Sequence, residues 1–243
     1  MLRIYFGDTD KDKDKFIFDQ IASVMPSDVF LLVPDQFTLQ AERNAFEYMN
    51  ADALLELEIV SRSGFARRIV SQEGSPGGVA VDKYGRFMLL TGLLLKEQKE
   101  EGIFASVRKK NSFISLVNDM ISDMKQYDVT PSELAEIESS LNDDSVLCEK
   151  ISDVREIYEK YEELLAGRYL DSEDFLRIVS EKIRGSELVK SHRFWIDGFD
   201  YMTPKLLSMV EAIACTAPEV NVVFTGDDRN AEGQFAVFQR MRK

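Results

Sequence analysis

A polar loop after the first predicted strand has the spacing of a phosphate-binding motif. In a P-loop, G-x-x-x-x-G-K-[ST], glycines let backbone N–H groups wrap the phosphates, the lysine neutralises them and the hydroxyl residue holds magnesium. Gly7 and Lys13 occupy the first glycine and the lysine positions, but Asp12 replaces the second glycine and Asp14 replaces the hydroxyl residue. Because carboxylates repel a polyphosphate, the loop predicts a degenerate nucleotide site.

A second acidic position follows a later strand. Residues Phe194 to Ile196 are apolar, and Asp197 comes directly after them. This is the Walker B pattern, in which the carboxylate helps to hold magnesium. The glutamate that an ATPase usually places next to it is replaced by Gly198. We therefore predict that Gly7, Lys13 and Asp197 form a degenerate nucleotide site without a catalytic residue, although an aspartate that only caps a turn is the structural alternative.

Metal chemistry has little support in the sequence. The alternating aspartates of the same loop resemble an EF-hand, but that loop needs glycine at its sixth position and glutamate at its twelfth, where this chain has Lys13 and Asp19. One histidine, His192, and two distant cysteines, Cys148 and Cys215, argue against zinc or iron–sulfur sites. We predict no metal site, and we predict both cysteines to be reduced core thiols.

A basic group lies at a predicted strand-to-helix junction, Ile59 to Arg68. The guanidinium groups of arginine and the hydroxyl groups of serine donate hydrogen bonds to phosphate, so Arg62, Ser63 and Arg67 are candidate nucleic-acid contacts. Phe65 in the same segment is expected in the core. A solvated helix face is the alternative explanation for the arginines in the helix.

Five short apolar runs predict the strands that must position these residues. The run Val29–Val33 is apolar at every position, which is typical of a strand covered on both faces, as in a parallel sheet. Helical patterns lie between the early strands, and this alternation predicts an α/β fold with a parallel sheet. The predicted strands are Leu2–Phe6, Val29–Val33, Leu54–Val60, Arg193–Ile196 and Val220–Phe224.

The middle of the chain shows helical patterns and no convincing strand. Thr130, Pro131 and Glu133 form a strong helix start, with a capping threonine, proline at the first position and glutamate at the third. We predict an α/β domain of residues 1–80 plus 190–243, interrupted by an all-helical insertion of residues 81–189. The predicted helices of the insertion are Phe87–Glu97, Phe104–Tyr127, Glu133–Leu141, Val146–Leu165 and Glu173–Ile183.

Composition limits the possible partners. The 243 residues include 30 basic and 43 acidic ones, and the net charge of −13 argues against strong unspecific binding to nucleic acid, though a local basic groove remains compatible with it. The acidic surface leaves open a protein-interaction scaffold. No apolar stretch has the length of a membrane span and no signal peptide is evident, so we expect a cytoplasmic protein. The helical pattern at Phe235–Lys243 has no stop signal, which indicates a longer natural chain.

Four segments at this separation resemble the N-terminal region of AddB/RexB, a component of the bacterial AddAB-type helicase–nuclease. The first is Leu32–Thr38 (LVPDQFT), followed by Glu42. The second is the serine- and arginine-rich junction described above. The third and fourth are Tyr169–Phe175 (YLDSEDF) and Ile196–Pro204 (IDGFDYMTP).

The resemblance implies a P-loop NTPase-like domain, similar to domain 1A of a superfamily 1 helicase, with a helical 1B-like insertion. It implies decayed helicase motifs and a DNA-binding role in a double-strand-break repair complex, with an AddA/RexA-type subunit as partner. The family's nuclease domain and iron–sulfur cluster lie far beyond this region. We therefore expect no cofactor in this chain, neither ATP with magnesium nor a cluster. An active P-loop ATPase or helicase remains the alternative.

The resemblance also implies that the family's surface for scanning single-stranded DNA falls on particular residues here. Gln36 and Thr38 match the family's scanning positions, whereas Arg62, Gly64 and Arg67 stand where the family has other residues. A basic replacement still suits a phosphate backbone. The candidate contacts with single-stranded DNA are Gln36, Thr38, Arg62, Ser63 and Arg67.

Overall fold

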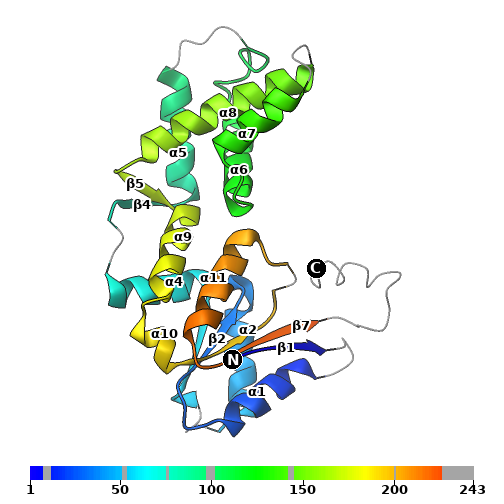
Figure 1. The fold of residues 1–243 in the computed structure, drawn as a ribbon, viewed down its shortest axis with the longest axis vertical. Coiled ribbons are helices and arrows are strands. Elements are labelled where there is room, and N and C mark those ends of the chain that lie inside the picture. Colours follow the sequence, from blue (N-terminus) through cyan, green and yellow to red (C-terminus); the bar gives the residue numbers. More distant parts are fainter. Residues whose placement is uncertain are drawn as a thin grey trace, which may run out of the picture. The chain divides into compact units, whose positions relative to one another are not determined.

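The structure is a computed structural model that describes residues 1–7, 12–50, 54–74, 77–96, 102–141, 145–199 and 201–225. The chain forms two compact units, which are described separately (Figure 1). The first, here called the sheet unit, comprises Met1–Ser75, Ile178–Met202 and Leu206–Lys243. The second, called the helical unit, comprises Pro76–Arg177 and Thr203–Lys205.

The sheet unit is built on five parallel strands in the order β1-β7-β6-β2-β3. Leu31 of β2 pairs with Trp195 on one side and with Ile59 on the other, which fixes the register. The predicted α/β class with a parallel sheet is confirmed. The strands are β1 (Leu2–Gly7), β2 (Val29–Val33), β3 (Leu57–Ser61), β6 (Arg193–Ile196) and β7 (Val220–Thr225).

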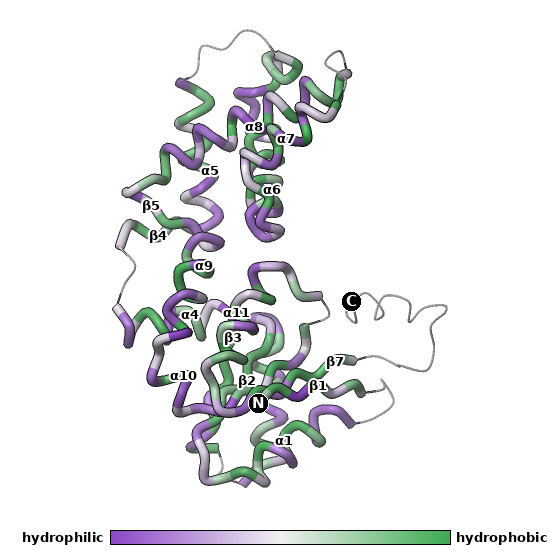
Figure 2. The backbone as a smooth tube through the Cα atoms, in the orientation of Figure 1, coloured by the Kyte–Doolittle hydropathy of each residue, from purple (hydrophilic) through white to green (hydrophobic). Residues whose placement is uncertain are grey.

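Strand β2 is buried along its whole length because helices cover both of its faces. Successive side chains of β2 point to opposite faces. Leu31 packs in one core with Ile17 and Ile21, while Phe30 packs on Phe65 at a ring distance of 5.5 Å. Figure 2 shows hydrophobic residues along this strand. The described helices of this unit are α1 (Lys13–Ser23), the short η1 (Asp35–Phe37), α2 (Thr38–Tyr48), α4 (Arg62–Glu73) and α10 (Glu187–Ser191), together with the end of α9 (Ser172–Ile183) and α11 (Pro204–Thr216) from Leu206 onward.

The helical unit has its own core. Leu90, Ile114, Ile157 and Tyr161 from three helices are almost fully buried in it. The predicted helix start at Thr130 is confirmed, because a capping box forms with both hydrogen bonds present. The helices are α5 (Lys83–Lys96), α6 (Asn111–Gln126), α7 (Pro131–Ser140), α8 (Val146–Leu165) and the start of α9; β4 (Val79–Val81) pairs in parallel with β5 (Tyr169–Asp171).

The structure corrects three predictions. Residues 81–189 are not all helical, because β5 lies among them; a three-residue strand is too short to show alternation in the sequence. The predicted helix Phe104–Tyr127 begins only at Asn111, and the segment before it forms turns, such as the bond from the N–H of Val107 to the carbonyl of Phe104 at 3.0 Å. Cys148 is buried, but Cys215 is exposed and is not a core thiol. None of the helices in the described ranges is both long and apolar enough to cross a bilayer.

Candidate functional site

Three elements of the sheet unit bring Lys13, Asp197 and Thr225 together. Lys13 begins α1, Asp197 follows β6 and Thr225 ends β7, and the carboxyl ends of parallel strands meet at one edge of the sheet. Nζ of Lys13 lies 2.8 Å from Oδ1 of Asp197 and donates to Oγ1 of Thr225 at 3.2 Å. The lysine that a P-loop offers to phosphate is therefore neutralised by a carboxylate of the same chain.

Two more aspartates fill the start of α1. Oδ1 of Asp12 accepts the backbone N–H of Lys15 at 3.0 Å, so the helix N-terminus that holds phosphate in a P-loop is capped internally. Oδ2 of Asp14 accepts a hydrogen bond from Asn44 at 2.7 Å. Burial and the nearby charge of Asp197 raise the pKa of the Asp14 carboxyl above its ordinary value. This arrangement disfavours a further negative group at the helix start.

Gly7 ends β1 and pairs with Thr225, at the same edge of the sheet as Lys13. Asp12 has a φ of −71°, so the backbone conformation that would strain an aspartate at a glycine position is not present. The loop between them, residues 8–11, lies outside the described residues, and so do two aspartates of the EF-hand-like pattern.

The predicted DNA contacts after β2 and β3 come together because these strands are neighbours. Gln36 is exposed in η1, and Thr38 begins α2 with its hydroxyl bonded to the carbonyl of Asp35 at 3.1 Å. The hydroxyl of Ser63 donates to Oδ1 of Asp35 at 2.8 Å, which joins the two loops. Arg62 lies half-buried beside Ser63 at the start of α4.

Asp35 is a residue of this candidate site that the sequence interpretation missed. Burial raises the pKa of its carboxyl, but hydrogen bonds from Ser61 and Ser63 and the charge of Arg62 outweigh it, so the pKa lies below its ordinary value. A stable carboxylate therefore ties the β2 loop to the β3 loop. Arg67, the remaining candidate, is exposed on α4 more than one helical turn beyond Arg62, and thus on a different side of that helix.

Comparison with known proteins shows the family of the chain. The family described as ADDB, N-terminal, matches residues 4–243. The chain belongs to the AddB N-terminal family. The resemblance noted in the sequence is thereby confirmed.

Several curated relatives of this AddB N-terminal chain are named as the B subunit of an ATP-dependent helicase/deoxyribonuclease. The relative from Alkaliphilus metalliredigens (strain QYMF) is 30% identical over 228 residues, which cover 92% of this chain and 20% of the relative. That from Anoxybacillus flavithermus (strain DSM 21510 / WK1) is 31% identical over 221 residues, with 88% and 19% covered. The AddB N-terminal chain therefore spans about a fifth of the length of the curated relatives it matches.

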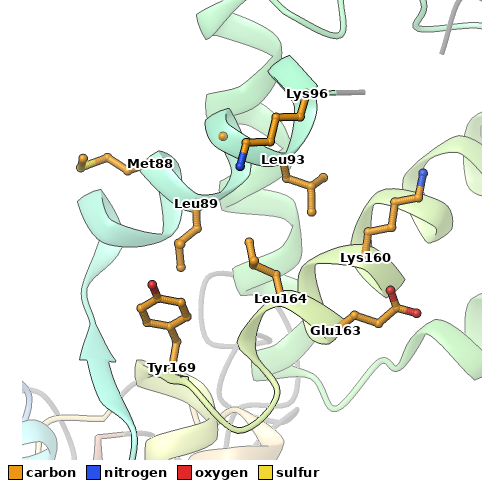
Figure 3. Close-up of a pocket in the computed structure, with 9 residues that line it drawn as sticks. Met88, Leu89, Leu93, Lys96, Lys160, Glu163, Leu164 and Tyr169 are labelled. Carbon is orange, nitrogen blue, oxygen red and sulfur yellow. The ribbon is translucent and has the colours of Figure 1, made fainter. Parts of the chain in front are cut away.

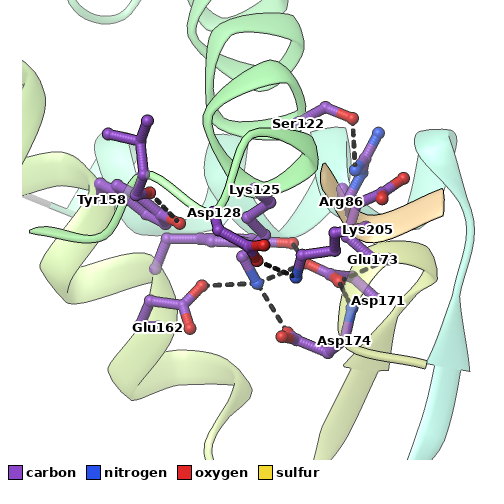
Figure 4. Close-up of polar contacts among 12 residues, drawn as sticks. Arg86, Ser122, Lys125, Asp128, Tyr158, Glu162, Asp171, Glu173, Asp174 and Lys205 are labelled. Carbon is purple, nitrogen blue, oxygen red and sulfur yellow. Dashed lines mark hydrogen bonds and ion pairs between the residues drawn. The ribbon is translucent and has the colours of Figure 1, made fainter. Parts of the chain in front are cut away.

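The helical unit of this AddB N-terminal chain contains a buried polar cluster (Figure 4). Nζ of Lys125 lies 2.7 Å from Asp171, 2.6 Å from Asp174 and 2.6 Å from Glu162. Burial lowers the pKa of Lys125, but the charges of Asp171 and Asp174 outweigh it and raise the pKa. Oxygens of the three carboxylates lie within 4.8 Å of one another, and the cation among them is the lysine ammonium. The cluster joins α6, α8, β5 and α9.

The same unit carries an apolar groove of about 670 Å³ between α5 and α8 (Figure 3). Leu89, Leu93 and Leu164 line it, and Met88 at its side is 72% exposed. Lys96 and Lys160 lie on the side away from Tyr169, as Figure 3 shows. The sequence pattern of α5, with apolar residues on more than one face, is the signal from which this groove could have been found.

Proposed function

We propose that this chain is the N-terminal, helicase-like part of one component of a double-strand-break repair helicase–nuclease, that it does not hydrolyse ATP, and that it contributes contacts to single-stranded DNA. Family membership supports the assignment to that component. The observation that carries the proposal is the ion pair between Lys13 and Asp197, which fills the phosphate position of the cradle. The neighbouring strand ends remain exposed to a ligand.

The fold proposed here is P-loop NTPase-like, with the sheet unit as the 1A-like domain and the helical unit as the 1B-like insertion. It is supported by Lys13 at the start of the helix after β1 and by Asp197 at the end of β6, two strands away in the sheet. A working nucleotide site needs a lysine that contacts the phosphates and a hydroxyl residue that holds magnesium. Because Asp14 replaces that hydroxyl residue, we propose a degenerate site at Gly7, Lys13 and Asp197, with no bound ATP or magnesium.

The proposed DNA contacts are Gln36, Thr38, Arg62, Ser63 and Arg67. Ligands of open α/β sheets collect at the carboxyl ends of the strands, where the first four of these lie. Hydroxyl and arginine groups contact phosphates, while an exposed amide can reach a base. Because the net charge of the chain is −13, its DNA affinity comes from the few basic residues near the contact, and we expect it to be weak.

A filter-binding titration with single-stranded oligonucleotides at low salt tests the DNA contact. We expect measurable retention by the wild-type chain and a clear loss for the Arg62→Ala/Arg67→Ala variant. Equal, negligible retention of both proteins would remove DNA contact from the proposed function.

A second function, docking of the AddA/RexA-type partner protein in the cytoplasm, is favoured by the apolar groove of the helical unit. Met88 is 72% exposed beside it, and exposed apolar patches mark protein interfaces. If this groove holds the partner, Met88→Asp should abolish co-purification with that protein and leave DNA retention unchanged. Co-purification at the wild-type level would exclude the groove from the contact between the two proteins.

A further inference from the structure

A cavity of about 240 Å³ lies in the sheet unit beside the ion pair of Lys13 and Asp197. Its wall is formed by the start of α1, the end of β2, η1, α2 and the residues after β6. It thus joins the degenerate nucleotide site to the loop that carries Gln36. The proposed DNA contacts do not use it. Its lining residues are Lys13, Asp14, Val33, Phe37, Gln40, Ala41, Asn44, Asp197 and Gly198.

The charges of this cavity disfavour a phosphate. Asp14 and Asp197 contribute two carboxylates to its lining, and Lys13, the cation among the described lining residues, is already paired at 2.8 Å. An entering phosphate would meet an excess of negative charge. Carboxylate oxygens accept hydrogen bonds, so a neutral group with N–H donors suits the cavity better.

Two side-chain amides lie next to these carboxylates and add further hydrogen-bond acceptors to the cavity. Nε2 of Gln40 donates to Oδ1 of Asn44 at 2.7 Å, and Nδ2 of Asn44 donates to Oδ2 of Asp14 at 2.7 Å. These bonds fix the orientation of both amides. They leave Oε1 of Gln40 as an acceptor to which no donor of the described residues is bonded. Asn44 is only 9% exposed, so the chain of bonds is held in place by packing.

An aromatic surface and a missing side chain give the cavity a flat wall. Phe37 is 42% exposed. Gly198 has a φ of +79°, and a Cβ placed there would lie 3.4 Å from Cδ2 of Phe37 and 3.2 Å from Cδ of Pro34. A planar group can therefore lie against the Phe37 ring beside the bare backbone of Gly198.

We propose that this cavity takes a nucleobase with an exocyclic amino group, splayed out of the DNA strand at the neighbouring sheet edge. The inference rests on the proposed function, which places the strand next to Gln36. Unstacked bases bind by stacking on aromatic rings and by hydrogen bonds along their edges. Adenine, cytosine and guanine carry an amino group that Asp14 and Gln40 can accept, and thymine carries none. At about 240 Å³ the cavity is smaller than the roughly 300–1,000 Å³ of drug-sized ligand pockets, which suits a single base.

Two measurements on the whole chain test this inference. In the first, fluorescence anisotropy compares a thymidine homopolymer with the same strand carrying one central cytosine. We expect the wild type to prefer the cytosine strand about fivefold, the value of one hydrogen bond. Gln40→Ala should remove the preference. Gln72→Ala, at an exposed position near the end of α4, should keep it. In the second, saturation-transfer NMR compares free deoxycytidine with free thymidine.

The outcomes separate the inference from the proposed function. Saturation transfer to deoxycytidine but not thymidine, lost in Gln40→Ala and retained in Gln72→Ala, supports the cavity even if no strand binds. Strand binding without a cytosine preference and without transfer to either nucleoside overturns the cavity and leaves the DNA contact intact. Equal transfer to both nucleosides also overturns it, and so does an unchanged cytosine preference in Gln40→Ala. If neither strand binding nor saturation transfer is detected, both the proposed base site and the proposed contact with the strand are overturned.

Discussion

Two lysine ammonium groups form ion pairs with carboxylates of the same chain. Lys13 meets Asp197 at the edge of the sheet, with its side chain 22% exposed, and Lys125 meets three carboxylates with its side chain 3% exposed. The first pair is partly buried and keeps some contact with water, whereas the Lys125 ammonium has lost its hydration and depends on its partners. At the scale of residues, the first ion pair bears on the proposed function and the second on stability.

Lys125→Met should destabilise the chain by about 3–5 kcal/mol, because it leaves the fully buried Asp171 without its cation. Urea unfolding measures this change in the free energy of unfolding. Lys83→Met is the matched control, since Lys83 pairs with Asp119 at an exposed position and should cost about 1 kcal/mol or less. Equal losses for both variants would contradict the role of the buried cluster.

Acid should weaken the same cluster. Burial raises the pKa of Asp171, but Lys125 and the backbone N–H of Asp174 outweigh it and hold the pKa below its ordinary value of 3.8. A lowered pKa stabilises the folded state above the unfolded pKa, and this contribution is lost as pH falls through the folded pKa. At neutral pH Asp171→Asn should cost about 1.5–3 kcal/mol, and the gap to wild type should shrink below about pH 4. A gap that stays constant down to the acid transition would refute this account.

The sheet edge positions every candidate of the proposed site except Arg67. β2, β3, β6 and β7 are parallel, so the segments that follow them lie together although they are far apart in sequence. The turn after β6 depends on a glycine, since Gly198 has a positive φ and lies against Pro34. At the scale of elements, the backbone of this turn therefore shapes the cavity beside Phe37.

Gly198→Ala should destabilise the chain by about 1–3 kcal/mol, because a side chain at a positive φ is strained and its Cβ approaches Pro34 to 3.2 Å. Gly92→Ala is the matched control. Gly92 lies in α5 with no atom within 4 Å of a new Cβ, so alanine should stabilise the helix by about 0.4–1 kcal/mol. Thermal unfolding of both variants checks the opposite signs, and a stabilised Gly198→Ala would show that the turn tolerates a side chain.

The elements with the strongest local signals were predictable from the sequence. Arg193–Ile196 and Val146–Leu165 have the predicted bounds, because continuous apolarity and amphipathic periodicity are local properties. The parts that depend on distant partners were not predictable. The Lys125 cluster unites four elements, and the bond between Ser63 and Asp35 spans 28 residues. Single-sequence patterns contain no information on such pairs.

Under the proposed function, the net charge of the whole molecule limits how the chain can bind DNA. A chain of net charge −13 repels a polyanion at a distance, so binding must come from the few basic groups at one edge. The chain also spans only about a fifth of the length of its relatives. We therefore expect the isolated chain to bind DNA weakly and with a shallow dependence on salt.

Removing one phosphate contact should lower the salt dependence of binding to single-stranded DNA. Each contact contributes about 0.7 to the slope of log K against log salt. Arg62→Ala should therefore reduce the slope by about 0.7, and Arg184→Ala, in the exposed turn after α9, should leave it unchanged. Anisotropy titrations over a range of salt concentrations give both slopes. Identical slopes for wild type and Arg62→Ala would exclude that arginine from phosphate contact.

The thermal unfolding of the chain with and without ATP and magnesium tests the central claim most directly. A ligand at a hundred times its dissociation constant stabilises a protein by about 2.7 kcal/mol. Because Lys13 already forms an ion pair with Asp197, we predict that adding ATP and magnesium leaves the melting temperature of the wild type unchanged, and likewise that of Lys13→Ala. A rise of several degrees in the wild type that is lost in Lys13→Ala would contradict the account.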